Sequence, residues 1–353
     1  MRRVVHIGIM IALSVVLVVA MVSFVGFGPT LQAIGAAGVA PFAAVGVLTA
    51  LGLLIQAGAW AILNRPIRHN VRFRSLFAAS TVGLAGNLLT PSSFLGGEPF
   101  RVLYVSRTAN LPYHEVASAV VLVKYLEATS FVVLFSFSAI VSAIYYQEAL
   151  FGPYLGFGVA ILAVAGILLG VAGAMLLSLW RGWRPLSWIV RAVGRLPRLG
   201  RRIGGFRRRT RQMEDQVSRV FREEGRATWP VMGGQLLGQL AIFLKPAAFF
   251  YLGSHLKLDL GQLCLLYVAC QFLLSVQIMP AGAGTLDTGL LGTFALMGLG
   301  ESQHLAGCMA YLLCLRLWDV VLVGAGAWLT ARLGVRMFTA RPEPLVPSEP
   351  PEG

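Results

Sequence analysis

Long apolar stretches constrain this sequence more than any other feature, because a soluble fold could not bury them all. Only 12% of its 353 residues are charged, whereas an ordinary soluble domain has about 25%. A membrane-spanning helix needs about 20 mostly apolar residues. The long apolar stretches are 4–27, 37–63, 75–100, 116–146, 154–180, 228–256, 260–300 and 303–331. They are continuous rather than alternating, which excludes barrel strands. We therefore predict an all-α polytopic membrane protein with about six to eight transmembrane helices.

The net charge of +14 is concentrated in one connection. The segment 181–226 contains 14 arginines, no lysine and four acidic residues. Cytoplasmic loops carry an excess of Lys and Arg. We therefore expect this loop and the N-terminus, with Arg2 and Arg3, to be cytoplasmic in a multi-pass protein of the cell membrane. Nothing resembles a nucleic-acid recognition motif, so we expect no nucleic-acid partner.

The segment 73–107 begins as an apolar helix and is then broken. Pro91, Gly96, Gly97 and the Glu98/Arg101 pair follow each other closely, and a plain lipid-facing helix does not tolerate them. Interrupted backbone persists at membrane depth only where it is buried in protein or lines a wet cavity. We therefore predict a re-entrant or discontinuous helix that enters and leaves on the same side.

A second break, in the last third of the chain, follows the same order. In each half a proline is followed seven positions later by an acidic residue, with two glycines between them. A helix carrying a base and an acid three residues apart comes next. The corresponding residues are Pro91, Glu98, Lys124 and Glu127 in the first half and Pro280, Asp287, Arg316 and Asp319 in the second. Broken apolar segments at matching positions of two halves indicate a transporter's binding site. We therefore predict an internal, inverted repeat.

The repeat divides the chain into one membrane domain, 1–335, and a tail. We expect a first half at about 1–180, the basic loop 181–226, a second half at about 227–335 and a disordered tail at 342–353. The side of the C-terminus stays open. Its arginines favour the cytoplasm, which requires 282–300 to cross fully, whereas a strictly paired re-entrant arrangement puts that end outside.

The chemistry of the two breaks suits a negatively charged ligand. Half-helix N-termini bind anions, glycines allow close backbone approach, and arginine offers a planar fork to phosphate. The candidate binding residues are Asn87, Pro91, Gly96, Gly97, Glu98, Arg101, Lys124, Glu127, Pro280, Gly282, Gly284, Thr285, Asp287, Arg316 and Asp319. Two simpler interpretations stay open. The intrahelical ion pairs could serve only membrane insertion, and the glycines only close helix packing. We expect no catalytic residue, metal or cofactor, because no catalytic or nucleotide-binding motif is present.

These two segments and the charged helices that follow them resemble the lysylphosphatidylglycerol synthase transmembrane region, a flippase-like domain. The resemblance covers about residues 1–335, and we expect no synthase domain of the kind found in some members. The family often has Arg and Asp where Lys124 and Glu127 stand here, and Glu where Asp287 stands. Charge is kept at all three positions, so we expect the roles to be kept, although the substrate could differ.

The resemblance implies that the chain binds a phosphate-bearing lipid, or flips it across the cytoplasmic membrane, in support of envelope lipid or lipid-linked glycan biogenesis. Arg101, Lys124 and Arg316 would attract the headgroup, while the carboxylates would hold those bases or bind an amine. Expected partners are anionic or polyprenyl-phosphate lipids. A homodimer or a complex with a lipid-modifying enzyme stays open. The alternatives are a membrane-embedded enzyme using Glu98 or Asp287 as acid or base, and a non-transporting accessory subunit of lipid biosynthesis.

Overall fold

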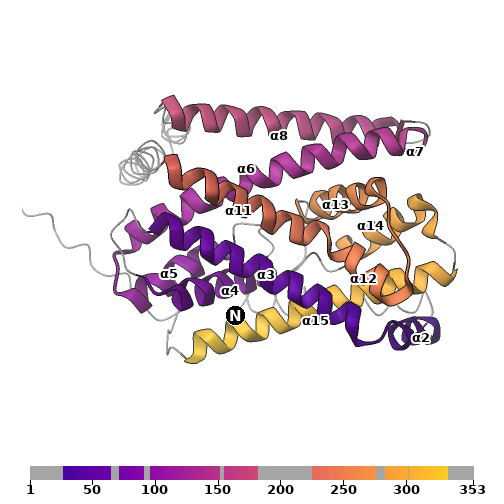
Figure 1. Ribbon diagram of the computed structural model, residues 1–353, viewed down its shortest axis with the longest axis horizontal. Helices are drawn as coiled ribbons and strands as arrows, with labels where there is room; N and C mark the ends of the chain where they lie inside the picture. Colours follow the sequence, from indigo (N-terminus) through magenta and orange to yellow (C-terminus); the bar gives the residue numbers. More distant parts are fainter. Residues whose placement is uncertain are drawn as a thin grey trace, which may run out of the picture.

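The computed structural model describes residues 27–64, 71–90, 96–151, 155–181, 225–275, 282, 284–300 and 302–332. Every regular element within these ranges is helical (Figure 1), which confirms the all-α class. The expected first span up to residue 26, most of the basic loop, the tail, Pro91 and Pro280 lie outside the described residues.

Four helices are long and apolar enough to cross a membrane in the described part of the chain. They are α3 (Val39–Asn64), α6 (Tyr113–Tyr145), α11 (Gly225–Phe243) continuing into α12 (Lys245–Ser254), and α15 (Ser302–Arg332). A lipid-facing stripe on α6 consists of Val133, Phe137, Ile140 and Ile144, all exposed and spaced for one helix face. Hence the outward surface is apolar, as a bilayer requires.

Two further helices of the first half, α4 (Phe73–Leu89) and α5 (Glu98–Ala109), form a re-entrant hairpin. They pack against each other and are too short, at about 1.5 Å per residue, for each to cross the roughly 30 Å apolar core. α4 starts nine positions after α3 ends, and α5 ends four positions before α6 starts. Both therefore lie at the end of the molecule where α3 ends and α6 begins (Figure 1).

The second half builds the same hairpin from the opposite end. α13 (Leu260–Ser275) follows α12 closely, and α14 (Thr285–Phe294) with the π-turn η3 (Ala295–Leu299) leads directly into α15. Because α12 ends and α15 begins at the far end, this hairpin enters there (Figure 1). The two hairpins thus point towards the middle of the molecule from its two ends.

The helices of the two halves correspond when the sequence is shifted by 189 residues, the separation of Glu98 and Asp287. The shift carries α3 onto α11–α12, α4 onto α13, α5 onto α14–η3 and α6 onto α15. In Figure 1 each long helix runs opposite to its counterpart. Packing between the halves is reciprocal, since α4 packs on α15, α13 on α6, and α3 on α11. This is the arrangement of an inverted repeat.

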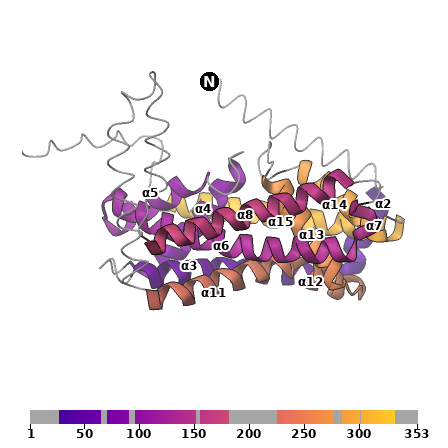
Figure 2. The same ribbon diagram turned by 90° about the horizontal axis from the view of Figure 1, so that it is seen from above.

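Three helices have no described counterpart. α2 (Phe27–Ala37) packs on α15 and α12, while α7 (Gln147–Phe151) and α8 (Leu155–Arg181) follow α6. α8 lies along α6 at the edge of the bundle (Figures 1 and 2).

The hairpins also decide where the charged ends lie. α8 ends with Arg181 and α15 ends with Arg332 at the same end of the molecule, where α3 ends and α4 begins (Figure 1). Of the two alternatives left open, the one that placed the C-terminal end opposite the basic loop is wrong. The other placed that end correctly but required a full crossing, whereas α14 belongs to a hairpin. The reason is that α13 and α14 pack against each other as the two arms of one hairpin, so α15 returns to the side where α11 started.

We predict that Arg107 and Arg332 lie on one side of the membrane and Lys257 on the other. Each would be changed to Cys in a background lacking the four native cysteines, and all three positions are exposed. An impermeant maleimide should label Arg107→Cys and Arg332→Cys together, and label Lys257→Cys only in vesicles of the reverse orientation. Labelling of all three in the same vesicles would contradict the inverted arrangement.

Glycines bring α4 and the start of α5 into unusually close contact. A Cβ at Gly97 would overlap the carbonyl oxygen of Gly83, and a Cβ at Gly86 would approach the Gly97 Cα to 2.9 Å. The Gly97 N–H donates to Asn87 Oδ1 at 2.6 Å. Asn87 therefore holds the two arms of the hairpin together beside the break.

Gly97→Ala should destabilise the protein by about 1–3 kcal/mol, because the hairpin arms must separate to admit the methyl group. Gly173→Ala on α8 is the control, since nothing lies within 4 Å of a Cβ there, and Ala is the better helix former. Thermal unfolding in detergent measures both. An equal or higher melting temperature for Gly97→Ala would contradict the close packing.

Candidate functional site

A cavity of about 650 Å³ lies between the two halves, within the size range of small-molecule sites. Both re-entrant hairpins reach it: Asn87 of α4 and Glu98 of α5 line it from the first half, and Leu274 of α13 and Leu286 of α14 from the second. The long helices α3, α6, α11 and α15 form further walls. The cavity therefore lies where the two hairpins approach each other.

The first half contributes a continuous chain of four charges. Lys124 Nζ lies 3.2 Å from Glu98 Oε1 and 3.1 Å from Glu127 Oε1. Arg101 Nη1 lies 3.6 Å from Glu98 Oε2. Gln56 Nε2 donates to Glu127 Oε2 at 3.1 Å. Two bases and two acids cancel, so this cluster is neutral as a unit.

Arg101 is the most deeply held member, with 2% of its side chain exposed. Its guanidinium carbon lies 4.4 Å from the centre of the Trp60 ring, and Nη2 donates to Ser80 Oγ at 3.2 Å. Nε is buried without a hydrogen bond. This cation is therefore held in place by stacking on Trp60, by a hydrogen bond to the neutral Ser80 and by the charge of Glu98.

The second half contributes a tighter cluster around Arg316. Its Nη2 lies 2.9 Å from Asp287 Oδ1 and 3.0 Å from Oδ2, and Nε donates to Oδ1 at 3.1 Å. Nη1 donates to Asp319 Oδ2 at 3.0 Å. Asp287 is 3% exposed, and its Oδ2 accepts the Gly284 N–H at 2.9 Å. The planar fork of arginine thus joins the start of α14 to α15.

The two clusters share one plan. In each, an acid in the first turn of a hairpin helix pairs with a base on the following long helix, which also pairs with an acid three residues later. The resemblance implied that carboxylates hold the bases, and the geometry has Glu98, Glu127 and Asp287 doing so. The structure contains both intrahelical ion pairs, but Lys124 and Arg316 each also pair with an acid on another helix. The pairs therefore connect helices as well as neutralising charge for membrane insertion.

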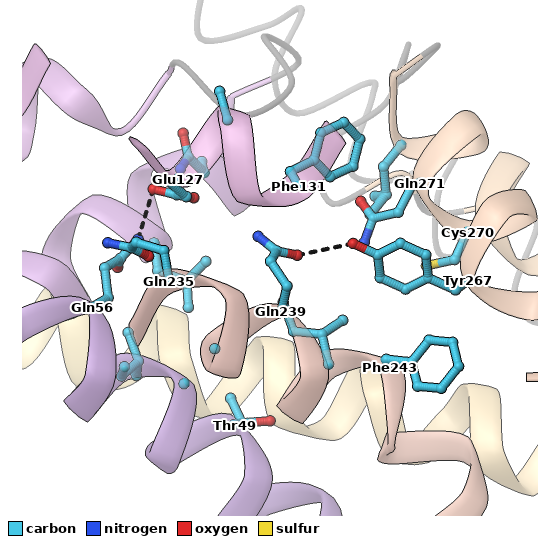
Figure 3. Close-up of a pocket in the computed structure, with 18 of the residues that line it drawn as sticks. Thr49, Gln56, Glu127, Phe131, Gln235, Gln239, Phe243, Tyr267, Cys270 and Gln271 are labelled. Carbon is cyan, nitrogen blue, oxygen red and sulfur yellow. Dashed lines mark hydrogen bonds between the residues drawn. The ribbon is translucent and has the colours of Figure 1, made fainter. Parts of the chain in front are cut away.

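Neutral polar side chains continue the cavity between the clusters. Figure 3 shows Gln235 and Gln239 of α11 and Gln271 of α13 facing the cavity, with Tyr267 OH donating to Gln239 Oε1 at 3.0 Å. Gln235 Nε2 is buried without a hydrogen bond. Sequence reasoning missed these residues. Two glutamines four positions apart within an apolar span were the available signal.

The predicted binding residues fall into three groups. Those that line the cavity are Asn87, Glu98, Arg101, Lys124, Glu127 and Asp319. Asp287 and Arg316 adjoin it through their ion pairs. Gly96, Gly97, Gly282, Gly284 and Thr285 shape the starts of α5 and α14 rather than the cavity wall.

Positive φ angles explain two of these glycines. Gly282 has φ +64° and Gly284 φ +84°, values that other residues adopt only at a cost. Within the described ranges, no group of three or more His, Cys, Asp or Glu side chains is arranged to hold a metal ion.

Comparison with known proteins agrees with this architecture. The model of the family described as the lysylphosphatidylglycerol synthase transmembrane region matches residues 6–324. The chain belongs to this family. The match includes both hairpins and both charge clusters. The family is named after the membrane region of a lipid-modifying enzyme, which indicates a multi-pass membrane protein of lipid metabolism.

Two archaeal relatives are also membrane proteins. A UPF0104 membrane protein of Methanothermobacter thermautotrophicus is 24% identical over 333 residues, covering 90% of this chain and 94% of the relative. A second UPF0104 membrane protein, from Methanocaldococcus jannaschii, is 29% identical over 85 residues, covering 24% of this chain and 25% of the relative. No solved structure matches significantly.

The two clusters should differ in how much stability they contribute. Arg316→Ala leaves buried Asp287 without its cation, which costs about 3–5 kcal/mol. Lys124→Ala should cost less, because Glu98 keeps Arg101 and Glu127 keeps Gln56. Thermal unfolding of both variants in detergent checks the order, and a larger loss for Lys124→Ala would contradict this account of the pairing.

Proposed function

We propose that this protein binds a phosphate-bearing lipid by its headgroup and carries it between the two leaflets of the cell membrane. The observation that carries the proposal is the cavity between inverted halves, with ionic and amide groups on some walls and hydrocarbon on others. Membership of a family named for lipid synthesis supports a lipid as cargo.

An amphiphile fits the two kinds of wall. The headgroup would lie among the charge clusters and glutamines. On the α8 and α11 side, Val171 and Ile242 line the cavity yet are 50% and 37% exposed on the surface of the protein. α6 packs against both of these helices. The hydrocarbon tails would leave the cavity between α8 and α11 and stay in the bilayer.

Alternating access fits the inverted hairpins. Each hairpin enters from its own end and carries one ion-paired acid: Glu98 lines the cavity and Asp287 adjoins it. In inverted-repeat transporters, rocking of one repeat against the other opens the central site to each side in turn. Loosening Glu98–Lys124 on one side or Asp287–Arg316 on the other would open the corresponding half of the path.

Orientation follows from the arginines. Arg72, Arg74, Arg107, Arg181 and Arg332 all lie at the end of the molecule where α3, α8 and α15 finish. The excess of positive charge on cytoplasmic loops supports placing this end in the cytoplasm. We propose a transporter rather than an enzyme, because both candidate acid–base carboxylates, Glu98 and Asp287, are committed to cations.

Reconstitution in liposomes tests the proposal. The protein should accelerate exchange of a fluorescent phospholipid between leaflets at least tenfold over empty liposomes. Ala172→Trp fills the cavity from its α8 wall and should abolish most of this acceleration. Leu169→Trp is the matched control, because Leu169 is exposed on the same helix and does not line the cavity, so its rate should equal that of the unmodified protein.

Two results would contradict the proposal. One is a rate no faster than that of empty liposomes for folded, correctly reconstituted protein. The other is equal inhibition by Ala172→Trp and Leu169→Trp, since the effect would then come from added bulk on α8 and not from the cavity. Formation of a new lipid product without exchange would favour an embedded enzyme.

A further inference from the structure

Lys245 stands apart from the other charged residues of the cavity. Three basic side chains line the cavity in the described ranges: Arg101, Lys124 and Lys245. Arg101 and Lys124 each have carboxylate partners. Lys245 forms neither an ion pair nor a hydrogen bond with any described residue. It is therefore the cavity base whose charge is not already neutralised by contact.

The surroundings of Lys245 do not explain this exception. It begins α12 directly after Leu244, within the span Thr228–Ser254. The titratable side chains that act on it electrostatically are Asp319, Cys270 and Cys314, and Asp319 already pairs with Arg316. An ammonium inside a membrane span costs about 2.5–3.5 kcal/mol on insertion scales. No structural contact offsets that cost among the described residues, which points to a ligand.

The inverted repeat sharpens the contrast. The same 189-residue shift places Lys245 at the position of Gln56. In the first half, Gln56 bonds Glu127, the acid on the long helix. In the second half, the acid with the same role on the long helix is Asp319, which lies three positions beyond the exact shift. It acts electrostatically on the cation Lys245. The first cluster is neutral by itself, whereas Arg316 with two carboxylates carries one surplus negative charge. Lys245 is within electrostatic reach of Asp319 but does not contact it, so its side-chain N–H groups stay available to a ligand.

We propose that Lys245 is the anion-binding group of the cavity, taking a phosphate-type oxyanion whose remaining hydrogen-bonding groups meet the glutamines of α11 and α13. This rests on the proposed function only for the identity of the ligand as a lipid headgroup. A base already paired must break an ion pair to accept an anion, whereas Lys245 need not. The role first expected of Arg101, Lys124 and Arg316 thereby passes to Lys245, and those three hold the architecture.

Lys245→Met tests the assignment, with Lys257→Met as the control in an exposed loop outside the cavity. Binding would be measured on detergent-solubilised protein by native mass spectrometry with phosphatidylglycerol, with diacylglycerol of the same tails as the headgroup-free reference. Lys245→Met should weaken phosphatidylglycerol binding at least tenfold and leave diacylglycerol binding unchanged. Lys245→Arg should keep most of the affinity, and Lys257→Met all of it.

The melting temperature without lipid separates a ligand role from a structural one. Because Lys245 forms no ion pair, Lys245→Met should not lower the melting temperature, unlike Arg316→Ala. A titration with inorganic phosphate identifies the source of the anion. Tighter binding of phosphatidylglycerol assigns the site to a lipid headgroup, and equal or tighter binding of inorganic phosphate assigns it to the free ion.

The proposal would be overturned if Lys245→Met changed the binding of neither phosphatidylglycerol nor phosphate. It would also be overturned if Lys245→Met lowered the melting temperature as much as Arg316→Ala does. These measurements involve no leaflet exchange. Lys245-dependent binding without any exchange in liposomes would therefore contradict transport and keep the anion site.

Discussion

Ion pairs between a hairpin helix and a long helix are the interaction on which the rest of this fold depends. Charged groups are expensive at membrane depth, and a buried base that loses its acid is more expensive still. Pairing Glu98 with Lys124 and Asp287 with Arg316 fixes the start of each hairpin's second helix against α6 or α15. Because α5 and α14 cannot span the bilayer alone, these pairs and the glycine contacts decide where the hairpins end and therefore where the cavity lies.

Reciprocal packing turns two small hairpins into one site. α4 packs on α15 and α13 on α6, so each hairpin rests on the long helix of the other half while its acid pairs with the long helix of its own. A displacement of one half must therefore change the surroundings of both acids. In transporters built from inverted repeats, rocking of one repeat against the other opens the central site to each side in turn, and the proposed transport would use this symmetry.

Much of this arrangement could be predicted from the sequence, because membrane insertion requires long apolar stretches and restricts where charges, proline and glycine can stand. The lengths of the apolar stretches predicted the long helices, and the proline and glycine residues predicted where the helices are interrupted. The three-residue spacing predicted that Lys124 and Glu127 share one helix face. It predicted the same for Arg316 and Asp319. The pairings across helices did not follow from spacing, which does not relate Glu98 to Lys124. Only the resemblance implied that the carboxylates would hold the bases. The alternative with strictly paired re-entrant segments placed the C-terminal end on the wrong side. Hydropathy alone does not distinguish two short helices within 260–300 from a helix that crosses the membrane. Gln235 was missed as a cavity residue, and Lys245 stayed ambiguous in the sequence, because isolated polar residues also occur as snorkelling or packing groups.

The differences between the halves say more about function than their similarity. A perfect repeat would give both clusters the same charge and the cavity no preferred end. Here the first half has Arg101 stacked on Trp60 and a neutral Gln56 beside Glu127, while the second half has Lys245 near an acid-rich cluster. The polar groups between them are amides and hydroxyls, which bond a ligand without trapping it electrostatically. A headgroup would therefore be held by charge at one end of the path and by neutral hydrogen bonds along the rest, which permits both binding and release.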